Sequence, residues 1–116
     1  MVVKIRMSLE DLLKKQKRFH DKVVLDNEKF PVDKGPAIFM LTTALIHEAI
    51  ELQRLTNWKW WKRETHLDEE AAKEELVDIF HFFMDLVVTM GMDAEELEKE
   101  YERKLKINYE RLANGY

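Results

Sequence analysis

The sequence contains no cysteine, and this absence excludes several kinds of chemistry. Without cysteine the chain has no disulfide bond, no zinc finger and no thiol nucleophile. Glycine and proline are scarce, with three and two among 116 residues, which is not typical of β-sandwiches or low-complexity chains. The sequence has no apolar run of membrane-spanning length, and its first residues are too few and too charged for a secretion signal. We therefore expect a cytoplasmic protein that does not bind membranes.

The charged residues are numerous but balanced in sign. Lysine and arginine total 19 against 23 aspartates and glutamates, and the net charge is −4. Domains that bind nucleic acids usually carry a basic surface, so we expect no nucleic-acid partner. The chain is 46% hydrophobic and 36% charged, which favours a helical globular protein. Its length predicts a single domain, residues 1–116.

Apolar residues at helical spacing predict an all-α fold, a bundle of four main helices. Ser8 followed by Asp11 resembles a capping box, and a first helix follows it. The two prolines and the glycine of residues 29–36 predict a loop. A second helix is expected from about Ala37 to Leu55.

Residues 56–66 interrupt the helical period and are expected to form a loop. Asp68 is a suitable N-cap for a third helix that ends near Gly91. Asp93 is a suitable N-cap for a fourth helix that runs to about Ala113.

Acidic residues interrupt the apolar faces of the second and third helices. Glu48 lies in a row of leucines, and Glu51 borders that row one turn later; the row is Leu41, Leu45, Leu52 and Leu55. Glu75 and Asp78 are likewise three residues apart on a face with apolar neighbours. A buried, isolated carboxylate is costly, so a fold tolerates it when it has a partner.

Four carboxylates that converge in a core repel one another, and their pKa values rise unless a cation lies between them. Oxygen ligands without cysteine suit Mg²⁺, with Mn²⁺ as an alternative. We therefore predict two or more divalent ions held by Glu48, Glu51, Glu75 and Asp78, with room for the phosphates of a substrate. The alternative is that some of these acids are solvated residues at the edge of the core.

The fourth helix carries a basic face. Lys104, Asn108 and Arg111 are spaced i, i+4 and i+7, in register with Leu97 and Tyr101. Two cations and an amide suit phosphate oxygens and the polar edge of a base or sugar. The alternative is that Lys104 and Arg111 are ordinary surface charges.

Four segments together resemble the dimeric all-α deoxyuridine triphosphatase (dUTPase) family, within the MazG-like group of nucleotide pyrophosphohydrolases: "HEAIEL", "KWWK", "EELVDIFHFF" and "YERKLKINYERLANGY". The resemblance spans the chain from about Leu9 to Tyr116. The pattern E-x-x-E with a later E-x-x-D belongs to the whole group. "KWWK", "VDIFHFF" and the closing K-x-x-x-N-x-x-R-x-x-x-G-Y are particular to the dUTPase branch.

The resemblance implies Mg²⁺-dependent hydrolysis of dUTP to dUMP and pyrophosphate by a homodimer. It implies that the four acids hold the metal, and we assign catalytic roles to Glu48 and to Glu51, which would orient the attacking water. It assigns phosphate contacts to Lys62, Lys104 and Arg111. The expected nucleoside contacts are Gln16, His20, Trp61, Asn108 and Tyr116, where His20 stands at a position that is often Asn or Asp in the family.

The third helix is apolar on several faces, which indicates a subunit interface as well as a core contact. The residues expected to cover it are Phe80, Phe82, Phe83, Met84, Val87 and Val88.

Three other functions stay open at this point. One is a MazG-like pyrophosphohydrolase that prefers another base. A second is a di-iron carboxylate bundle, suggested by the spacing of Asp78 and His81, although we expect His81 to be a hydrogen-bonded neighbour of the metal cluster. The third is a helical dimerisation module without enzymatic activity.

Overall fold

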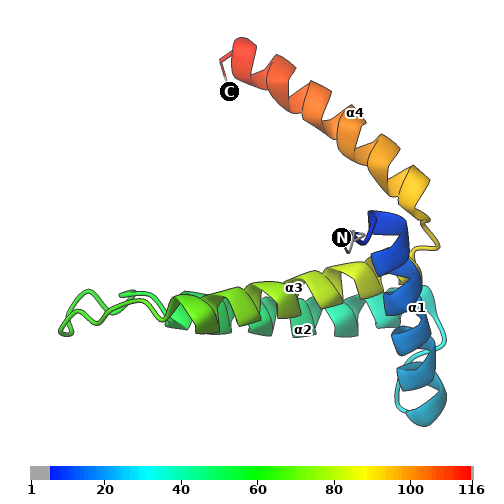
Figure 1. Cartoon of the computed structure of the whole chain (residues 1–116), viewed down its shortest axis with the longest axis horizontal. Coiled ribbons are helices and arrows are strands. Elements are labelled where there is room, and N and C mark those ends of the chain that lie inside the picture. Colours follow the sequence, from blue (N-terminus) through cyan, green and yellow to red (C-terminus); the bar gives the residue numbers. More distant parts are fainter. Residues whose placement is uncertain (1–5, 116) are drawn as a thin grey trace, which may run out of the picture.

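A computed structural model describes residues 6–115, and within this range the chain forms four α-helices joined by loops (Figure 1). The helices are α1 (Leu9–Asp26), α2 (Lys34–Arg54), α3 (Glu69–Thr89) and α4 (Ala94–Ala113). The predicted all-α fold with four main helices is confirmed. None of the helices in the described part of the chain is long and apolar enough to cross a membrane.

Side-chain caps begin three of the helices at the predicted residues. The hydroxyl of Ser8 accepts from the backbone N–H of Asp11, whose carboxylate accepts from the N–H of Ser8, so the capping box is confirmed. Asp68 caps α3 and Asp93 caps α4, each accepting a backbone N–H three residues later. These local contacts explain why the helix starts could be predicted.

The start of α2 differs from the prediction. The helix begins at Lys34 rather than near Ala37, so the last residues of the expected loop are helical. Pro36 falls in the first turn, where a backbone N–H has no partner within the helix and a proline is therefore tolerated.

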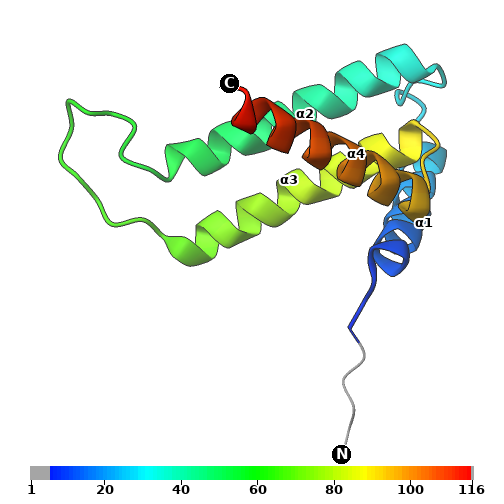
Figure 2. The same ribbon diagram turned by 90° about the horizontal axis from the view of Figure 1, so that it is seen from above.

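The helices α2 and α3 lie side by side as a hairpin, and α1 crosses one end of it (Figures 1 and 2). The small core lies at this crossing, where Leu13 of α1 packs with Met84 and Val87 of α3. Met84 and Val87 were expected at a subunit interface, and that expectation is wrong, because α1 and the start of α4 already bury them. Phe80 and Phe83 remain 38% and 40% exposed.

The fold is open for its size. Its solvent-accessible surface is 10111 Å², whereas a compact monomer of 14.0 kDa exposes roughly 6,700 Å². The helix α4 touches the rest of the chain near its first turns and then points away from the hairpin (Figure 1).

Candidate functional site

Three acidic side chains meet between α2 and α3. Glu48 and Glu51 of α2 and Glu75 of α3 each offer an oxygen atom, and these oxygens lie within 4.8 Å of one another. Glu48 and Glu75 are half-buried, while Glu51 is exposed. Helical periodicity puts Glu48 and Glu51 on adjoining positions of α2, and the pairing of the two helices brings Glu75 to them.

The carboxylates of Glu48 and Glu75 lie close together between the two helices. The Oε2 atom of each is buried and has no hydrogen-bond partner. A proton shared with Glu48, removal from water and the negative charge of Glu51 together raise the pKa of Glu75 to about 7. Near neutral pH the cluster therefore holds a proton that an exposed glutamate would have lost.

The donor set of this cluster fits a hard divalent cation. Among the described residues, no lysine or arginine forms an ion pair with Glu48, Glu51 or Glu75. Buried carboxylate oxygens without a partner are suitable ligands for such a cation, which would replace the shared proton. Asp78 does not join the three acids; it is half-buried one turn further along α3.

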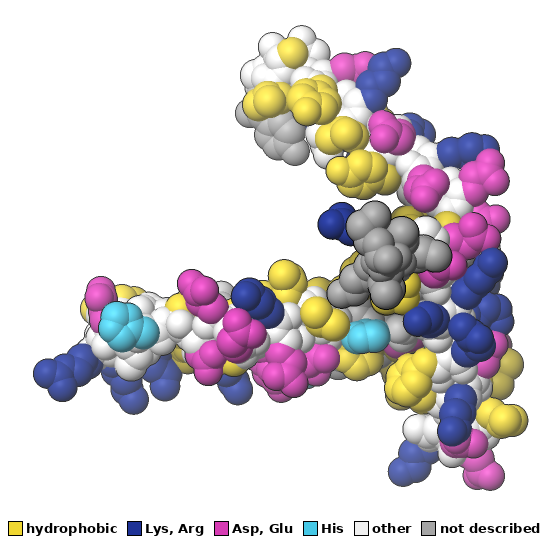
Figure 3. All heavy atoms as spheres, in the orientation of Figure 1, with side chains coloured by type: hydrophobic (Ala, Val, Ile, Leu, Met, Phe, Trp, Pro, Cys, Tyr) yellow, Lys and Arg dark blue, Asp and Glu magenta, His cyan; other side chains and the backbone are white. Residues whose placement is uncertain are grey.

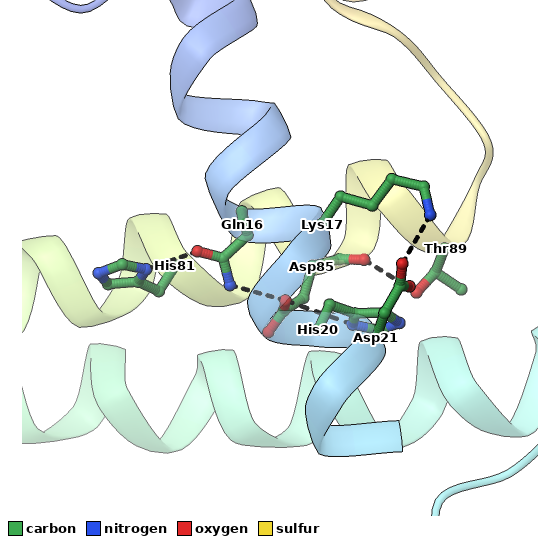
Figure 4. Close-up of polar contacts among 7 residues, drawn as sticks. All are labelled: Gln16, Lys17, His20, Asp21, His81, Asp85 and Thr89. Atoms are coloured by element: carbon green, nitrogen blue, oxygen red, sulfur yellow. Dashed lines mark hydrogen bonds and ion pairs between the residues drawn. The ribbon is translucent and has the colours of Figure 1, made fainter. Parts of the chain in front are cut away.

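A polar network connects α1 to α3 (Figure 4). Gln16 is 4% exposed, and its Nε2 donates to Oδ1 of Asp85 over 2.8 Å. Its Oε1 lies 2.7 Å from Nδ1 of His81, and Nδ1 of His20 lies 3.3 Å from the same oxygen of Asp85. The predicted nucleoside contacts Gln16 and His20 are thus brought together with His81, and Gln16 is already hydrogen-bonded at both ends.

This network fixes the orientation of the Gln16 amide. Oδ1 of Asp85 accepts the hydrogen bond from Nε2, so the amino end of Gln16 faces Asp85 and the carbonyl end faces His81. Nδ1 of His81 is then the donor, and in the neutral ring Nε2 is left as an acceptor. Asp85 was not predicted from the sequence, although its position four residues after His81, within an apolar helix, was a usable signal.

The predicted contacts on α4 are not brought to the acids within one chain. Lys104, Asn108 and Arg111 are exposed, on the part of α4 that has left the hairpin (Figure 1). Tyr116, the remaining predicted contact near this end, lies outside the described residues.

The loop between α2 and α3 carries Trp61 and Lys62, which are both exposed. Hydrogen bonds between Asn57 and Thr65 hold the base of this loop: Nδ2 of Asn57 donates to the carbonyl of Thr65 over 3.0 Å, and the N–H of Thr65 donates to Oδ1 of Asn57 over 2.9 Å. The rings of Trp61 and Trp60 meet edge to face with centroids 5.6 Å apart. The loop extends beyond the ends of both helices (Figure 2), so Lys62 forms no ion pair with the acid cluster of its own chain.

Three known proteins are similar to part of this chain. A dCTP pyrophosphatase of Enterobacteria phage T4 is 44% identical over 71 residues, covering 51% of this chain and 42% of the relative. A dCTP pyrophosphatase of Enterobacteria phage LZ5 is 37% identical over 71 residues, covering 51% and 41%. A DNA replication protein of phage T4 is 41% identical over 61 residues, covering 42% of this chain and 16% of the relative.

The chain thus spans about two fifths of the length of the two pyrophosphatases that it matches. No solved structure matches the chain significantly. A family model described as dUTPase matches residues 8–93, which include the three acids and the whole Gln16 network but end before α4. Because this match covers most of the sequence, the chain belongs to that dUTPase family.

Proposed function

We propose that this protein hydrolyses a deoxynucleoside triphosphate, and dUTP in the first place, to the monophosphate and pyrophosphate with the help of Mg²⁺. The observation that carries the proposal is the convergence of Glu48, Glu51 and Glu75 with partnerless buried oxygens, in a chain of the dUTPase family. We also propose that the chain forms a single domain, that it acts in the cytoplasm and that it has no nucleic-acid partner, as expected from the sequence.

A second candidate substrate is dCTP, because two similar phage proteins are named dCTP pyrophosphatases. Uracil and cytosine differ in one exocyclic group, which is an accepting oxygen in uracil and a donating amino group in cytosine. A site that hydrogen-bonds this group discriminates between the two, because the wrong base leaves its polar groups unpaired.

The three acids have different tasks in this proposal. The half-buried Glu48 and Glu75 hold the metal, and the proposed set includes Asp78 and two or more ions, with Mn²⁺ as a substitute. Bound Mg²⁺ supplies positive charge that offsets the charge of the phosphate oxygens. Glu51 is exposed, so its carboxylate is accessible to accept a hydrogen bond from the attacking water and to orient it.

The polar face of α3 suggests where the nucleoside part of the substrate binds. Glu75, Asp78, His81 and Asp85 share this face, and His81 lies about 9 Å along the helix axis from Glu75 at 1.5 Å per residue. A nucleotide whose phosphates lie at the acids would therefore extend its base or sugar towards His81 and the Gln16 amide. The further nucleoside contacts in this proposal are His20, Trp61, Asn108 and Tyr116, and the phosphate contacts are Lys62, Lys104 and Arg111.

The proposed assembly is a homodimer. Six apolar residues of α2 and α3 line a pocket that is open to solvent: Leu45, Leu76, Val77, Ile79, Phe80 and Phe83. An exposed apolar face of this kind is typical of a subunit interface. The large accessible surface of one chain supports the same conclusion.

The function is tested with the five substrates dUTP, dCTP, dTTP, dATP and dGTP in the presence of Mg²⁺, measuring the release of pyrophosphate and monophosphate. We expect dUTP to be hydrolysed fastest and dCTP second fastest. EDTA should abolish this activity because it removes the metal. Glu75→Gln should be inactive, whereas Glu74→Gln, which changes an exposed neighbour outside the cluster, should be active.

The absence of turnover with either Mg²⁺ or Mn²⁺ would contradict the proposed function. Tightly bound iron with a visible absorption band would then favour the di-iron bundle, and binding of neither metal nor nucleotide would favour the dimerisation module. In the described part of the chain no histidine belongs to the acid group, which does not support a di-iron site.

A further inference from the structure

The direction of α4 is fixed by its connection to α3. Gly91 adopts a left-handed conformation with φ +72°, its N–H donates to the carbonyl of Val88, and the N–H of Met92 donates to that of Val87. These two hydrogen bonds form a Schellman motif, which ends α3 in one defined geometry. Asp93 then caps α4 with a 2.8 Å hydrogen bond to the N–H of Glu96.

The first turn of α4 is also packed. Met92, Ala94 and Leu97 contact the core formed by Leu13 and its neighbours. For α4 to fold back onto its own hairpin, the helix would have to leave these contacts and break the Schellman motif. The chain therefore holds α4 away from its own acid cluster.

Beyond its first turns, α4 exposes apolar side chains to solvent, as an interface does when its partner is absent. Tyr101, Tyr109 and Leu112 are 65%, 66% and 69% exposed. Hydrophobic side chains lie along the side of α4 that faces the α2–α3 hairpin, and open space separates the two (Figure 3). An amphipathic helix normally buries such a side against another element.

Charge is distributed unevenly along α4. Residues 95–102 hold five acidic residues and one basic residue, whereas residues 103–111 hold four basic residues and one acidic residue. Among the described residues, Lys104 and Arg111 have no ion-pair partner. The part of α4 that projects from the chain is therefore basic, and among the described residues the three acids form no ion pair with a lysine or arginine.

We propose that each active site is shared between two copies of this chain: the acids come from one copy, and Lys104 and Arg111 come from α4 of the other. This inference rests on the proposed function. A second copy that enters the space beside α4 covers its exposed apolar side and brings the basic residues to a phosphate chain held at the acids. The exposed apolar pocket of the hairpin provides the surface on which the second copy packs.

Heterodimers of defined composition test this arrangement. Two chains with different affinity tags are co-expressed, one carrying Glu48→Gln and the other Arg111→Ala, and the mixed dimer is isolated through both tags. If the sites are shared, one of the two sites contains an intact Glu48 and an intact Arg111, so the heterodimer should recover about half of the wild-type activity. If each chain forms its own site, both sites are damaged and no activity returns.

The reciprocal heterodimer gives the opposite result. A chain that carries both Glu48→Gln and Arg111→Ala is paired with a wild-type chain. Shared sites predict that both sites are damaged, whereas independent sites predict half of the wild-type activity. The matched control is Lys106→Ala, which changes a lysine on the opposite face of α4 and takes the place of Arg111→Ala in both heterodimers. Only Glu48→Gln then damages a site, so each heterodimer should keep about half of the wild-type activity.

Binding provides a readout that does not depend on turnover. Titration with a non-hydrolysable dUTP analogue and Mg²⁺ should find one site in the first heterodimer and none in the reciprocal one. The reversed pattern, or a wild-type protein that forms no dimer, would overturn the inference. A wild-type dimer that turns over no nucleotide would reject the proposed function instead, and the binding stoichiometry would then decide the inference. Glu75→Gln replaces Glu48→Gln if the latter does not fold.

Discussion

Gln16 and Asp85, 69 residues apart in the sequence, form a buried hydrogen bond in which Nε2 of the amide donates to the carboxylate over 2.8 Å. The two residues are 4% and 8% exposed, so water cannot easily replace the hydrogen bond that either side chain makes. The bond joins α1 to α3 at the place where the small core forms. It therefore affects both the stability of the fold and the geometry of the proposed nucleoside end.

Replacement of Asp85 tests the structural part of this conclusion. Asp85→Ala leaves the buried amino group of Gln16 unpaired, which should lower the free energy of unfolding by about 1–3 kcal/mol. Urea denaturation measures this change. Asp21→Ala is the control, because Asp21 forms an exposed pair with Lys17 and its removal should change stability by less than about 1 kcal/mol. Equal effects of the two substitutions would contradict the role given to Asp85.

Glu48→Gln should remove most of the hydrolytic activity while the fold stays intact or becomes more stable. The amide keeps the size of the side chain but removes one of the negative charges that repel each other in the metal-free cluster. Activity assays together with thermal denaturation without metal measure both effects. Full activity with an unchanged dependence on Mg²⁺ would exclude Glu48 as a metal ligand.

The pKa of Glu75 predicts how stability depends on pH without metal. The pKa of Glu75 in the folded protein is about 7, while the ordinary pKa of a glutamate side chain is 4.5. Between these values the folded state binds more protons than the unfolded state, so the free energy of unfolding should fall as the pH rises through this window. Glu75→Gln should remove this contribution and Glu74→Gln should keep it, as measured by urea denaturation across the range.

Mg²⁺ should reverse this dependence, because a cation binds the ionised cluster and competes with the proton. The increase in melting temperature on addition of Mg²⁺ should therefore be larger at pH 8, above the window, than at pH 5.5, inside it. An increase that does not change with pH would argue that the metal binds elsewhere.

Phe80→Glu should convert the proposed dimer to monomers, because it places a charge in the apolar face of the hairpin. Light scattering at micromolar concentration should give twice the chain mass of 14.0 kDa for the wild type and the single mass for the variant. Phe19→Glu changes an aromatic residue of α1 that is 62% exposed, and the dimer should persist. A wild-type protein that is monomeric would refute the proposed assembly.

Arg111 and Asn108 lie on one face of α4 but should affect kinetics differently. Arg111 offers a charged fork for phosphate oxygens, which every nucleoside triphosphate carries, so Arg111→Ala should lower the turnover of all substrates by a similar factor. Asn108 offers a donor and an acceptor, so Asn108→Ala should lower dUTP turnover more than dCTP or dTTP turnover. Kinetics on the two variants with these three substrates measure the effects. The opposite result would place the nucleoside nearer Gln16 and His20.

The features of this protein that depend on neighbouring residues could be predicted from the sequence. Helical periodicity and the caps at Ser8, Asp68 and Asp93 defined the helices, because these signals act within one or two turns. The pairing of Glu48 with Glu51 followed from the same spacing. That Glu75 meets them could be expected because helices that follow one another in the sequence usually lie side by side.

The contacts between distant segments depend on how the helices pack and could not be predicted from the sequence. The position of α1 joined Gln16 to Asp85 and buried Met84 and Val87 in the chain itself, and the spacing of residues in α3 does not contain this information. The Schellman motif at Gly91 and the packing of Leu97 set the direction of α4, which keeps Lys104 and Arg111 from the acids of the same chain. A pattern along one helix shows which residues share a face, whereas the packing of the other helices decides what that face meets.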